Sequence, residues 1–374
     1  MIYKVFECCR IIHGYGRCAI YDLQRNKYKF LPRILYELVD DKGCITPSDS
    51  IAQNKISQSD IDSLIEYLLI NEFIYPIEEI EKDRFSKLSL KWDYYSKISN
   101  CILSINKFFH DAYLSLFEKD LKRLNCRHIQ IQIFNNYPFE LLKKLQDGIN
   151  NSIIQSVEYN INSAFILDRE QFFGWIKSNT KIRFVALCCS NKTSVISEGN
   201  SGMGIIVETS EDIRNSNQCG FINQNYFSIN IECFTEAQCH NTCLNRKVCI
   251  DANRDNKNCP AITKNYGNIK DTTLEEAINK PGFKDLWFIN KDKIDVCKDC
   301  EFRYMCTDCR AFIKDPENIY SQPAKCTYNP YICLWEGQEG YVPVEECGTY
   351  SRETDFVPDK KKIAKLNREI WGND

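Results

Sequence analysis

The chain of 374 residues lacks several features that would assign it to a familiar class of protein. No segment approaches the roughly 18 consecutive apolar residues of a membrane-spanning helix. The N-terminus MIYKVFECCR carries Glu7 and two cysteines where a secretory signal has an uninterrupted apolar stretch. With 48 Lys+Arg against 51 Asp+Glu, the net charge of −3 provides no global basic field that would attract nucleic acid. We therefore expect a cytoplasmic protein with neither a membrane nor a nucleic acid as partner.

Glycine (15 residues) and proline (11 residues) are also scarce, and no low-complexity tract or flexible linker stands out. Hydrophobic residues make up 43% of the chain, which is enough apolar material to bury sizeable cores. The chain is therefore expected to fold, and its domain limits have to come from changes in the residue pattern.

Cysteine is the abundant exception, with 21 residues. Twelve of them lie between Cys233 and Cys347, and the other nine are scattered over the preceding 232 residues. A disulfide framework is typical of small secreted chains, whereas this chain is large and its cysteine count is odd. We interpret the scattered nine as ordinary buried thiols and the dense segment as the place where the chemistry lies.

Residues 1–80 show the pattern of a small domain with a hairpin, helices and a final strand. The expected elements are a hairpin from Ala19 to Phe30, helices over Pro32–Val39 and Asp60–Phe73, and a strand over Phe73–Ile77. The second helix has an apolar stripe of period 3.6, and Ser57 or Ser59 is available as its cap. This combination predicts a winged-helix-like domain over residues 1–94.

The usual partner of a winged helix is DNA, but the charge of this segment argues against it. Residues 1–80 hold nine Lys+Arg against twelve Asp+Glu, and the clearest helix carries Asp60, Asp62 and Glu66. Such a surface repels a duplex. A purely structural or dimerising role remains open beside peptide recognition.

From about residue 97 the pattern alternates between strands and helices, which argues for β/α units around a largely parallel sheet. We expect strands over residues 98–105, 128–134, 153–159, 182–187, 203–207 and 227–231, and helices over residues 108–124, 139–145 and 168–177. The prediction is a partial β/α barrel over residues 95–232. Gly202-Met-Gly204 is too short for a phosphate loop, and His110 and His128 lack the neighbours of a catalytic or metal site.

The cysteine-rich segment contains two runs with the spacing of metal ligands. The first extends from Cys239 to Cys259, and the second contains the pairs Cys297-Lys-Asp-Cys300 and Cys306-Thr-Asp-Cys309. A CxxC pair in a tight turn aims two sulfurs at one metal, and thiolates suit zinc or iron–sulfur clusters. A dozen unligated thiols in one region of a cytoplasmic protein would invite oxidation. The segment therefore predicts metal binding.

At these residues the sequence resembles the SPASM family, the auxiliary-cluster domain that follows the barrel in radical-SAM peptide and protein maturases. In that family a cysteine is followed by Gly-x4-Cys, then by CxxC-x5-C-x3-C, and then by a last cysteine. The corresponding residues here are Cys243, Arg254-x4-Cys259, Cys297-x2-Cys300-x5-Cys306, Cys309 and Cys326. The match covers about residues 239–333, inside a predicted SPASM domain of residues 233–350 that precedes a C-terminal helical tail of residues 351–374.

The resemblance implies two four-iron four-sulfur clusters. One would be held by Cys243, Cys249, Cys259 and Cys309, and the other by Cys297, Cys300, Cys306 and Cys326. Two departures from the family pattern matter, because Arg254 stands where Gly is usual and the Cys306 to Cys309 spacing is one residue short. The first is expected to strain a hairpin turn. The second leaves the role of Cys309 open. Four cysteines have no assigned cluster and are candidates to replace an assigned ligand: Cys233, Cys239, Cys333 and Cys347.

A radical-SAM enzyme needs a CxxxCxxC motif that leaves one iron open for S-adenosylmethionine, by what is known of that family. The only CxxxC here, Cys239 to Cys243, has Arg246 in place of the third cysteine. After the first barrel strand the chain continues as Ile105-Asn-Lys-Phe-Phe-His-Asp, without cysteine. We therefore expect no use of S-adenosylmethionine, and whether the chain is an enzyme at all stays open.

The whole arrangement resembles the SPASM protein of grasp-with-spasm peptide-maturation systems. That resemblance implies a ribosomally made precursor peptide and an ATP-grasp ligase as partners, with this chain as an accessory maturation protein. The leader of the precursor would add as a strand along the hairpin Ala19 to Phe30 and against the helix Asp60–Phe73, if the apolar stripe of that helix is only partly committed to the core. Three alternatives stay open: an enzyme in which an auxiliary cluster ligates or oxidises the peptide, a zinc-binding structural scaffold, and a cluster-containing regulator.

Overall fold

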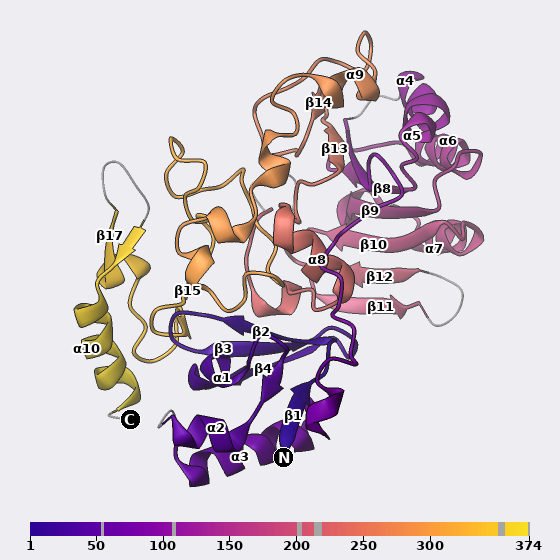
Figure 1. Cartoon of the computed structure of the whole chain (residues 1–374). Helices are drawn as coiled ribbons and strands as arrows, with labels where there is room; N and C mark the ends of the chain where they lie inside the picture. Colours follow the sequence, from indigo (N-terminus) through magenta and orange to yellow (C-terminus); the bar gives the residue numbers. More distant parts are fainter. Residues whose placement is uncertain (54–55, 107–109, 200–203, 213–218, 351–355, 373–374) are drawn as a thin grey trace. The chain divides into compact units, whose positions relative to one another are not determined.

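The computed structural model describes residues 1–53, 56–106, 110–199, 204–212, 219–350 and 356–372. The chain forms two compact units (Figure 1). Unit 1 comprises Met1–Trp92, Ile222–Thr242 and Ile289–Asp374, and unit 2 comprises Asp93–Phe221 and Cys243–Phe288. No helix of the described residues has both the length and the apolar character needed to cross a membrane.

Unit 2 is built on an eight-stranded sheet with the order β11-β12-β10-β9-β8-β7-β13-β14. Its strands are β7 (Asn100–Ile105), β8 (His128–Ile133), β9 (Ser156–Asn162), β10 (Ile182–Cys188), β11 (Ser194–Glu198), β12 (Ile205–Glu208), β13 (Lys247–Ile250) and β14 (Asn256–Lys257). The six strands from β12 to β13 run parallel, and β11 and β14 pair antiparallel at the two edges. Figure 1 shows β8, β9, β10, β12 and β11 side by side in that order.

Helices connect consecutive parallel strands in this sheet. They are α4 (Ala112–Ser115), a π-helical turn η2 (Leu116–Asp120) and α5 (Leu121–Arg123) between β7 and β8, α6 (Phe139–Asn150) between β8 and β9, and α7 (Arg169–Ser178) between β9 and β10. The helix α9 (Leu274–Asn279) follows β14 and connects no strands of the sheet. In β8, Ile129, Ile131 and Ile133 are buried, while the alternate residues are partly exposed. A large, mostly parallel sheet with one apolar face thus confirms the α/β class, and consecutive neighbouring strands are typical of β/α units.

Most elements predicted in this region are found in the structure, but the helix predicted over residues 139–145 extends to Asn150 and the strand β11 was not predicted. Three further differences concern the predicted bounds and types. The helix predicted over residues 108–124 is divided by the π-helical turn η2, and its first two residues lie outside the described residues. The strand predicted from residue 203 begins at Ile205 in the structure, and Met203 itself is not described. The strand predicted over residues 227–231 is wrong: Ile231 begins the helix α8 (Ile231–Cys239), because the Asn230 side chain accepts the Cys233 N–H at 2.8 Å and caps it.

In unit 1 the N-terminal segment forms two three-stranded antiparallel sheets and three helices. The strands are β1 (Ile2–Val5), β2 (Cys9–His13), β3 (Cys18–Asp22), β4 (Lys27–Leu31), β5 (Cys44–Ile45) and β6 (Ile74–Ile77), and the helices are α1 (Ile34–Leu38), α2 (Pro47–Ala52) and α3 (Gln58–Ile70). The predicted hairpin is β3–β4, and Ser57 caps α3 by accepting the Asp60 N–H. The sheet orders are β5-β1-β6 and β2-β3-β4.

The apolar stripe of α3 is committed to the core. Ile61, Leu64, Ile65 and Leu68 are all buried and pack with residues of β3, α1 and β6. The condition set for peptide docking against this helix is therefore not met. A peptide that adds as a strand would therefore pair with a sheet edge without packing against the apolar stripe of α3.

The sheet β2-β3-β4 packs on both of its faces, because all five residues of β3 are buried. Cys18 and Ile20 belong to the core with α3, whereas Ala19 and Tyr21 belong to a second core with Phe302 and Met305 of the cysteine-rich segment. Unit 1 thus joins segments that are distant in sequence. The domain limits at residues 94, 232 and 350 stay predictions.

The remainder of unit 1 has little regular structure. It contains β15 (Tyr328–Asn329), β16 (Leu334–Trp335), β17 (Gly348–Tyr350), β18 (Phe356–Pro358) and α10 (Lys360–Trp371). The helix α10 lies in the predicted C-terminal tail, of which residues 351–355 and 373–374 are outside the described residues. Because these strands are short, the segment is held in place mainly by side-chain packing and by hydrogen bonds outside regular elements.

Candidate metal centre

Four of the eight predicted ligands gather in unit 1: Cys297, Cys300, Cys306 and Cys326. The turn η8 (Cys297–Asp299) is closed by the Cys300 N–H, which donates to the Cys297 carbonyl at 3.0 Å. The Phe302 N–H in turn donates to the Cys300 Sγ at 3.4 Å. Cys297 and Cys306 are buried, and the other two are half-buried. The CxxC pair therefore lies in a tight, hydrogen-bonded turn, as the spacing predicts.

The four thiols lie within electrostatic range of one another. Burial, together with the neighbouring Cys326, raises the pKa of Cys297 to about 11, although Lys291 opposes this shift. The same influences, with Cys297 added, raise the pKa of Cys306 to about 12. Burial and the neighbouring Glu301, Cys297 and Cys326 hold the pKa of Cys300 well above its usual value. Each thiol is thus close enough to others of the set to oppose their ionisation.

Lys291 provides a buried positive charge beside this group. Its side chain is 5% exposed, and its Nζ lies 3.9 Å from the Cys297 Sγ and 3.8 Å from the Asp308 Oδ1. Burial disfavours the ammonium, but Cys297, Cys306 and Asp308 outweigh it and raise the pKa of Lys291 above its usual value. A buried ammonium that interacts with Cys297, Cys306 and Cys326 fits a centre that carries negative charge when its ligands are thiolates.

A buried polar network holds both carboxylate oxygens of Asp308. Its carboxylate accepts from the Asn241 Nδ2 at 2.6 Å and from the Arg310 Nη2 at 2.7 Å. Arg310 also donates from Nη1 to the Ser321 carbonyl at 2.8 Å. Asp308, Asn241 and Arg310 are each at most 6% exposed. Since Asp308 lies between Cys306 and Cys309 in sequence, this network positions the second half of the cysteine motif.

The backbone before Cys297 is strained. Val296 has φ +66°, a left-handed conformation that is costly for a β-branched residue. It is 1% exposed and packs with Tyr331, Ile332 and Leu334. Surrounding packing therefore imposes the conformation with which the chain enters the CxxC turn.

Glu301 connects this centre to the sheet β2-β3-β4. Its Oε1 accepts from the Arg17 Nε at 2.7 Å and from the Tyr328 hydroxyl at 2.5 Å, and its carbonyl accepts from the Tyr21 hydroxyl. The Glu301 side chain is fully buried, so Arg17 balances its charge. The residue after Cys300 is thereby tied to the N-terminal segment.

The other four predicted ligands are divided between the units. Cys243, Cys249 and Cys259 belong to unit 2, and Cys309 belongs to unit 1. Cys249 lies in β13, and burial together with the neighbouring Cys259 holds its pKa well above the usual value. Cys249 and Cys259 are thus neighbours, whereas the complete set of four stays a prediction.

The turn between β13 and β14 contains the predicted strain. Arg254 has φ +73°, the conformation that favours glycine, which is the usual residue there in the resembling family. Its N–H donates to the Asp251 carbonyl at 2.8 Å, and the Asp251 N–H donates to the Asp255 carbonyl at 3.1 Å. The expectation of a strained hairpin turn at Arg254 is confirmed.

The four cysteines without an assigned cluster have varied environments. Cys347 is buried, and its Sγ accepts from the Asn329 Nδ2 at 3.3 Å. Cys333 and Cys233 are half-buried, and Cys239 is exposed. The prediction that Cys239 could replace one of the assigned cluster ligands stays open.

The scattered nine cysteines agree only partly with their interpretation as buried thiols. The buried ones are Cys9, Cys18, Cys44, Cys101, Cys126 and Cys188. Cys8 and Cys189 are half-buried and Cys219 is exposed, so the interpretation is wrong for Cys219. The two histidines have structural partners, since His128 Nδ1 lies 2.7 Å from the Ser156 hydroxyl and His110 lies 3.5 Å from Arg254.

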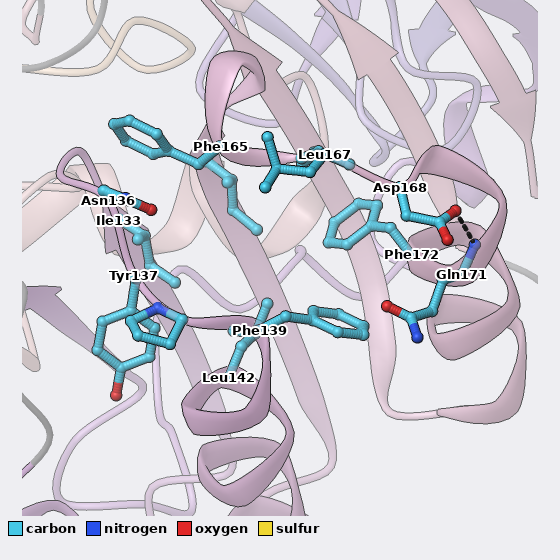
Figure 2. Close-up of a pocket in the computed structure, with 13 residues that line it drawn as sticks. Ile133, Asn136, Tyr137, Phe139, Leu142, Phe165, Leu167, Asp168, Gln171 and Phe172 are labelled. Atoms are coloured by element: carbon cyan, nitrogen blue, oxygen red, sulfur yellow. Dashed lines mark hydrogen bonds between the residues drawn. The ribbon is translucent and has the colours of Figure 1, made fainter.

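Unit 2 also contains an apolar pocket of about 240 Å³ where β8 and β9 end (Figure 2). Phe139, Phe165 and Phe172 line it, and Leu167 at its rim is 96% exposed. The Asp168 carboxylate accepts the Gln171 N–H at 2.9 Å and so caps α7. The carboxyl ends of parallel strands are where ligands bind in such sheets, and this pocket suits an apolar side chain.

Sequence patterns did not reveal Lys291, Asn241 or the pocket. Lys291 lies six residues before Cys297, outside the cysteine motif, and lysine is common on surfaces. Asp308 and Arg310 flank Cys309 in the motif, and this position was the available sequence signal for their role at the site.

No protein-family model matches the chain, and no curated protein matches it in sequence. Among solved structures, the crystal structure of SuiB from Streptococcus suis covers 86% of this chain and 99% of its own, with 11% identity and a TM-score of 0.38. SuiB bound to S-adenosylmethionine covers 83% of this chain and 96% of its own, with 10% identity and a TM-score of 0.36. Similarities at these TM-scores support no conclusion about fold or function.

Proposed function

We propose that this chain is an accessory maturation protein for a ribosomally made, post-translationally modified peptide, and that its cysteines hold two four-iron four-sulfur clusters. The observation that carries the cluster assignment is a set of four mutually interacting thiols, three of which act on the buried Lys291. Thiolates are the ligands of such clusters, and a fully cysteine-ligated cluster serves structure or electron transfer.

The spacing of the sulfurs favours a cluster over zinc. Ligand sulfurs of a tetrahedral zinc ion lie about 3.8 Å apart, since each Zn–S bond is about 2.3 Å. Among the described residues, the compact ligand groups with all atoms within 4.8 Å of one another do not include Cys297, Cys300, Cys306 or Cys326. A centre with several irons accommodates wider spacing than one zinc ion.

Anaerobic purification followed by metal analysis tests this assignment. The chain should be brown and contain about eight iron atoms with a comparable amount of acid-labile sulfide. Cys306→Ser should lose about half of both, and Cys347→Ser, which removes a buried cysteine outside the assigned sets, should lose neither. Stoichiometric zinc without sulfide would contradict the clusters and favour the zinc scaffold.

Peptide binding would use the N-terminal segment of unit 1. Because the α3 stripe is buried, the leader of the precursor would pair with the edge strand β4, which carries Lys27 and Lys29. The strand β6 offers a poorer edge, since Pro76 cannot donate a backbone hydrogen bond. The ATP-grasp ligase would then act on the bound precursor.

Titration of the full chain with the precursor peptide encoded beside it, and separately with duplex DNA, tests this role. Binding of the peptide with a micromolar or lower dissociation constant is expected, with weak and salt-sensitive binding of DNA. Tight sequence-specific DNA binding without peptide binding would identify a cluster-containing regulator instead. Formation of 5′-deoxyadenosine from S-adenosylmethionine under strong reduction, above a control without protein, would contradict the absence of radical chemistry.

A further inference from the structure

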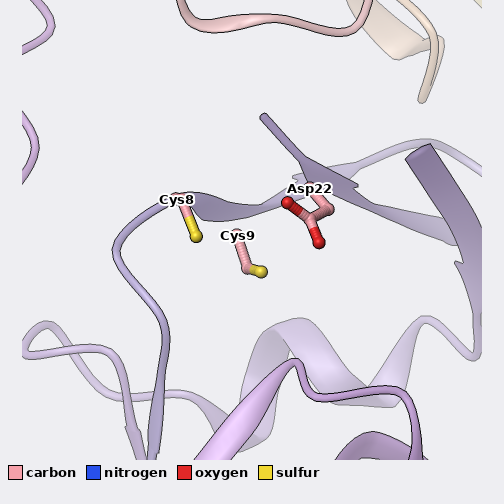
Figure 3. Close-up of side chains that lie close together, drawn as sticks. All are labelled: Cys8, Cys9 and Asp22. Atoms are coloured by element: carbon pink, nitrogen blue, oxygen red, sulfur yellow. The ribbon is translucent and has the colours of Figure 1, made fainter. Parts of the chain in front are cut away.

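A separate group of metal-binding side chains lies in the N-terminal segment. The sulfurs of Cys8 and Cys9 and a carboxylate oxygen of Asp22 all lie within 4.8 Å of one another. Cys9 is 4% and Asp22 is 2% exposed, and Cys8 is half-buried. Figure 3 shows the three side chains together. We propose that this triad binds a soft divalent cation of the zinc class.

The backbone holds these three side chains in place. The Cys9 N–H donates to the Phe6 carbonyl at 2.8 Å and closes a turn just before β2. Neighbouring residues of a regular strand point to opposite faces, so this turn is what allows both sulfurs to lie on one side. Cys9 is paired directly with Asp22 across β2 and β3, and the Leu23 N–H donates to the Cys8 carbonyl at 2.9 Å.

Asp22 retains an oxygen for a metal ion despite its structural role. Its Oδ1 accepts the N–H groups of Gln24 and Arg25 at 3.1 and 2.9 Å and thereby fixes the β3–β4 turn. Its Oδ2 has a longer contact of 3.3 Å with the Arg25 guanidinium, which also pairs with the Glu72 carboxylate. A carboxylate oxygen with one long contact keeps lone-pair capacity for a cation.

The donor set selects the class of metal. Two sulfurs and one carboxylate oxygen suit zinc better than magnesium or calcium, which prefer oxygen ligands alone. Zinc bonds of about 2.3 Å to sulfur and about 2.1 Å to oxygen place ligand atoms roughly 3.6 Å apart, so modest side-chain movement completes the site. Three protein ligands leave a fourth position for water. Two cysteines and one carboxylate supply fewer thiolates than the four-cysteine set assigned to the C-terminal centre, which distinguishes this site from that centre.

Binding exchanges protons for the metal. The two thiols release one proton each to water as two metal–sulfur bonds form, and no electron is transferred. Without metal, burial and the neighbouring Cys8 and Asp22 keep the pKa of Cys9 above its usual range, so Cys9 is held as the thiol. A cavity of about 440 Å³ borders one member of the triad and is lined in part by Cys9, Glu7 and Arg10.

Zinc protection of the native thiols tests the proposal directly. The full chain, purified without oxygen, is treated with iodoacetamide with and without one equivalent of zinc chloride, and each cysteine is followed by peptide mass spectrometry. Zinc should slow alkylation of Cys8 and Cys9 roughly tenfold or more, because a metal-bound thiolate is shielded. The exposed Cys219 should react at the same rate in both samples. Equal rates at Cys8 with and without zinc would overturn the proposal.

Metal content gives a second measurement that does not depend on the clusters. Chain reconstituted with iron and sulfide, then equilibrated with zinc and desalted, should hold one more zinc than Cys8→Ser/Cys9→Ser. Cys44→Ser, a buried thiol of the same segment, should retain that zinc. Asp22→Asn should weaken binding without removing either thiol, and circular dichroism identifies any variant that has not folded. Equal zinc in the double variant and the parent chain contradicts the triad, whatever the iron content shows.

Discussion

At the scale of single residues, Arg254 and Val296 are strained positions near predicted cluster ligands in sequence. Arg254 and Val296 both have positive φ, and they stand five residues before Cys259 and one residue before Cys297. The sequence indicated the first, because glycine is usual at that position in the resembling family. It could not indicate the second, because Val296 is held in place by packing from residues 331–334, which are distant in sequence.

Arg254→Gly should stabilise the chain by about 0.5–1 kcal/mol. A left-handed conformation costs an L-residue roughly 1–2 kcal/mol, which glycine avoids. The greater conformational freedom of glycine in the unfolded state offsets part of this stabilisation. Arg254→Ala keeps its Cβ atom and should give no such gain. Urea unfolding of the metal-free chain compares the three proteins, and equal stability of the Gly and Ala variants would show that the turn is not strained.

Lys291→Met should make the proposed cluster at Cys297 harder to reduce. Reduction adds negative charge, and the buried ammonium 3.9 Å from the Cys297 Sγ stabilises that charge. Removal of the ammonium should lower the reduction potential by roughly 50–100 mV, equivalent to about 1–2 kcal/mol for one electron. Redox titration followed by electron paramagnetic resonance measures the change.

Lys314→Met provides the matched control for Lys291→Met. Lys314 belongs to the same unit, but its Nζ pairs with Glu345 at 2.7 Å on the surface. Its removal should leave the potential unchanged. Equal shifts in both variants would mean that overall charge, and not the buried position of Lys291, sets the potential.

At the scale of elements, local patterns predicted what local interactions decide. The period-2 strand β8 and the helix α3 with its Ser57 cap were both predictable, because their signals lie within a few residues. The strand predicted over residues 227–231 failed because Phe227 and Ile229 pack against the core around Phe302 without forming a strand. Apolar residues in a short run show burial but not conformation.

Proline substitution in β4 should separate folding from peptide binding. Alternate residues of an edge strand direct their N–H groups toward β3 or away from it, so Tyr28→Pro and Lys29→Pro affect different sides. The variant that loses the outward N–H should fold and bind the precursor peptide at least about tenfold more weakly, or about 1.4 kcal/mol.

The other of these two variants serves as the control, because it removes a hydrogen bond of the sheet and should lower the melting temperature. Isothermal titration calorimetry on the full chain measures the affinity. Unchanged affinity in a folded variant with the outward N–H removed would exclude strand addition at β4.

At the scale of the whole molecule, sequence order predicted segments but not how they combine. The second face of the sheet β2-β3-β4 is buried against a core that includes Phe302 and Met305. These two residues come nearly 300 residues later in the chain. For the same reason, spacing identified eight cysteines but not Lys291, Asn241 or the triad of Cys8, Cys9 and Asp22. Tertiary packing between distant segments supplies these neighbours, and no local period records it.

The many buried thiols make the whole chain sensitive to alkali. Burial raises the pKa of Cys126 and of Cys188 to about 12, from an unfolded value of 9.0. Between these values the unfolded chain loses protons that the folded chain keeps, so stability is complete below about pH 9 and falls as pH rises toward 12. Cys126→Ala removes one such thiol and should reduce this fall by up to about 1.4 kcal/mol per pH unit.

Val185→Ala tests whether the thiol or the cavity is responsible for this change. Val185 is fully buried in β10 of the same unit, so its truncation also destabilises the core, but it has no group to ionise. Urea unfolding of the reduced, metal-free chain at pH 7.5, 9 and 10.5 should show parallel curves for the parent chain and Val185→Ala, and a shallower fall for Cys126→Ala. If the free energy of unfolding falls equally with pH in all three proteins, ionisation of the buried thiols does not cause the loss of stability in alkali.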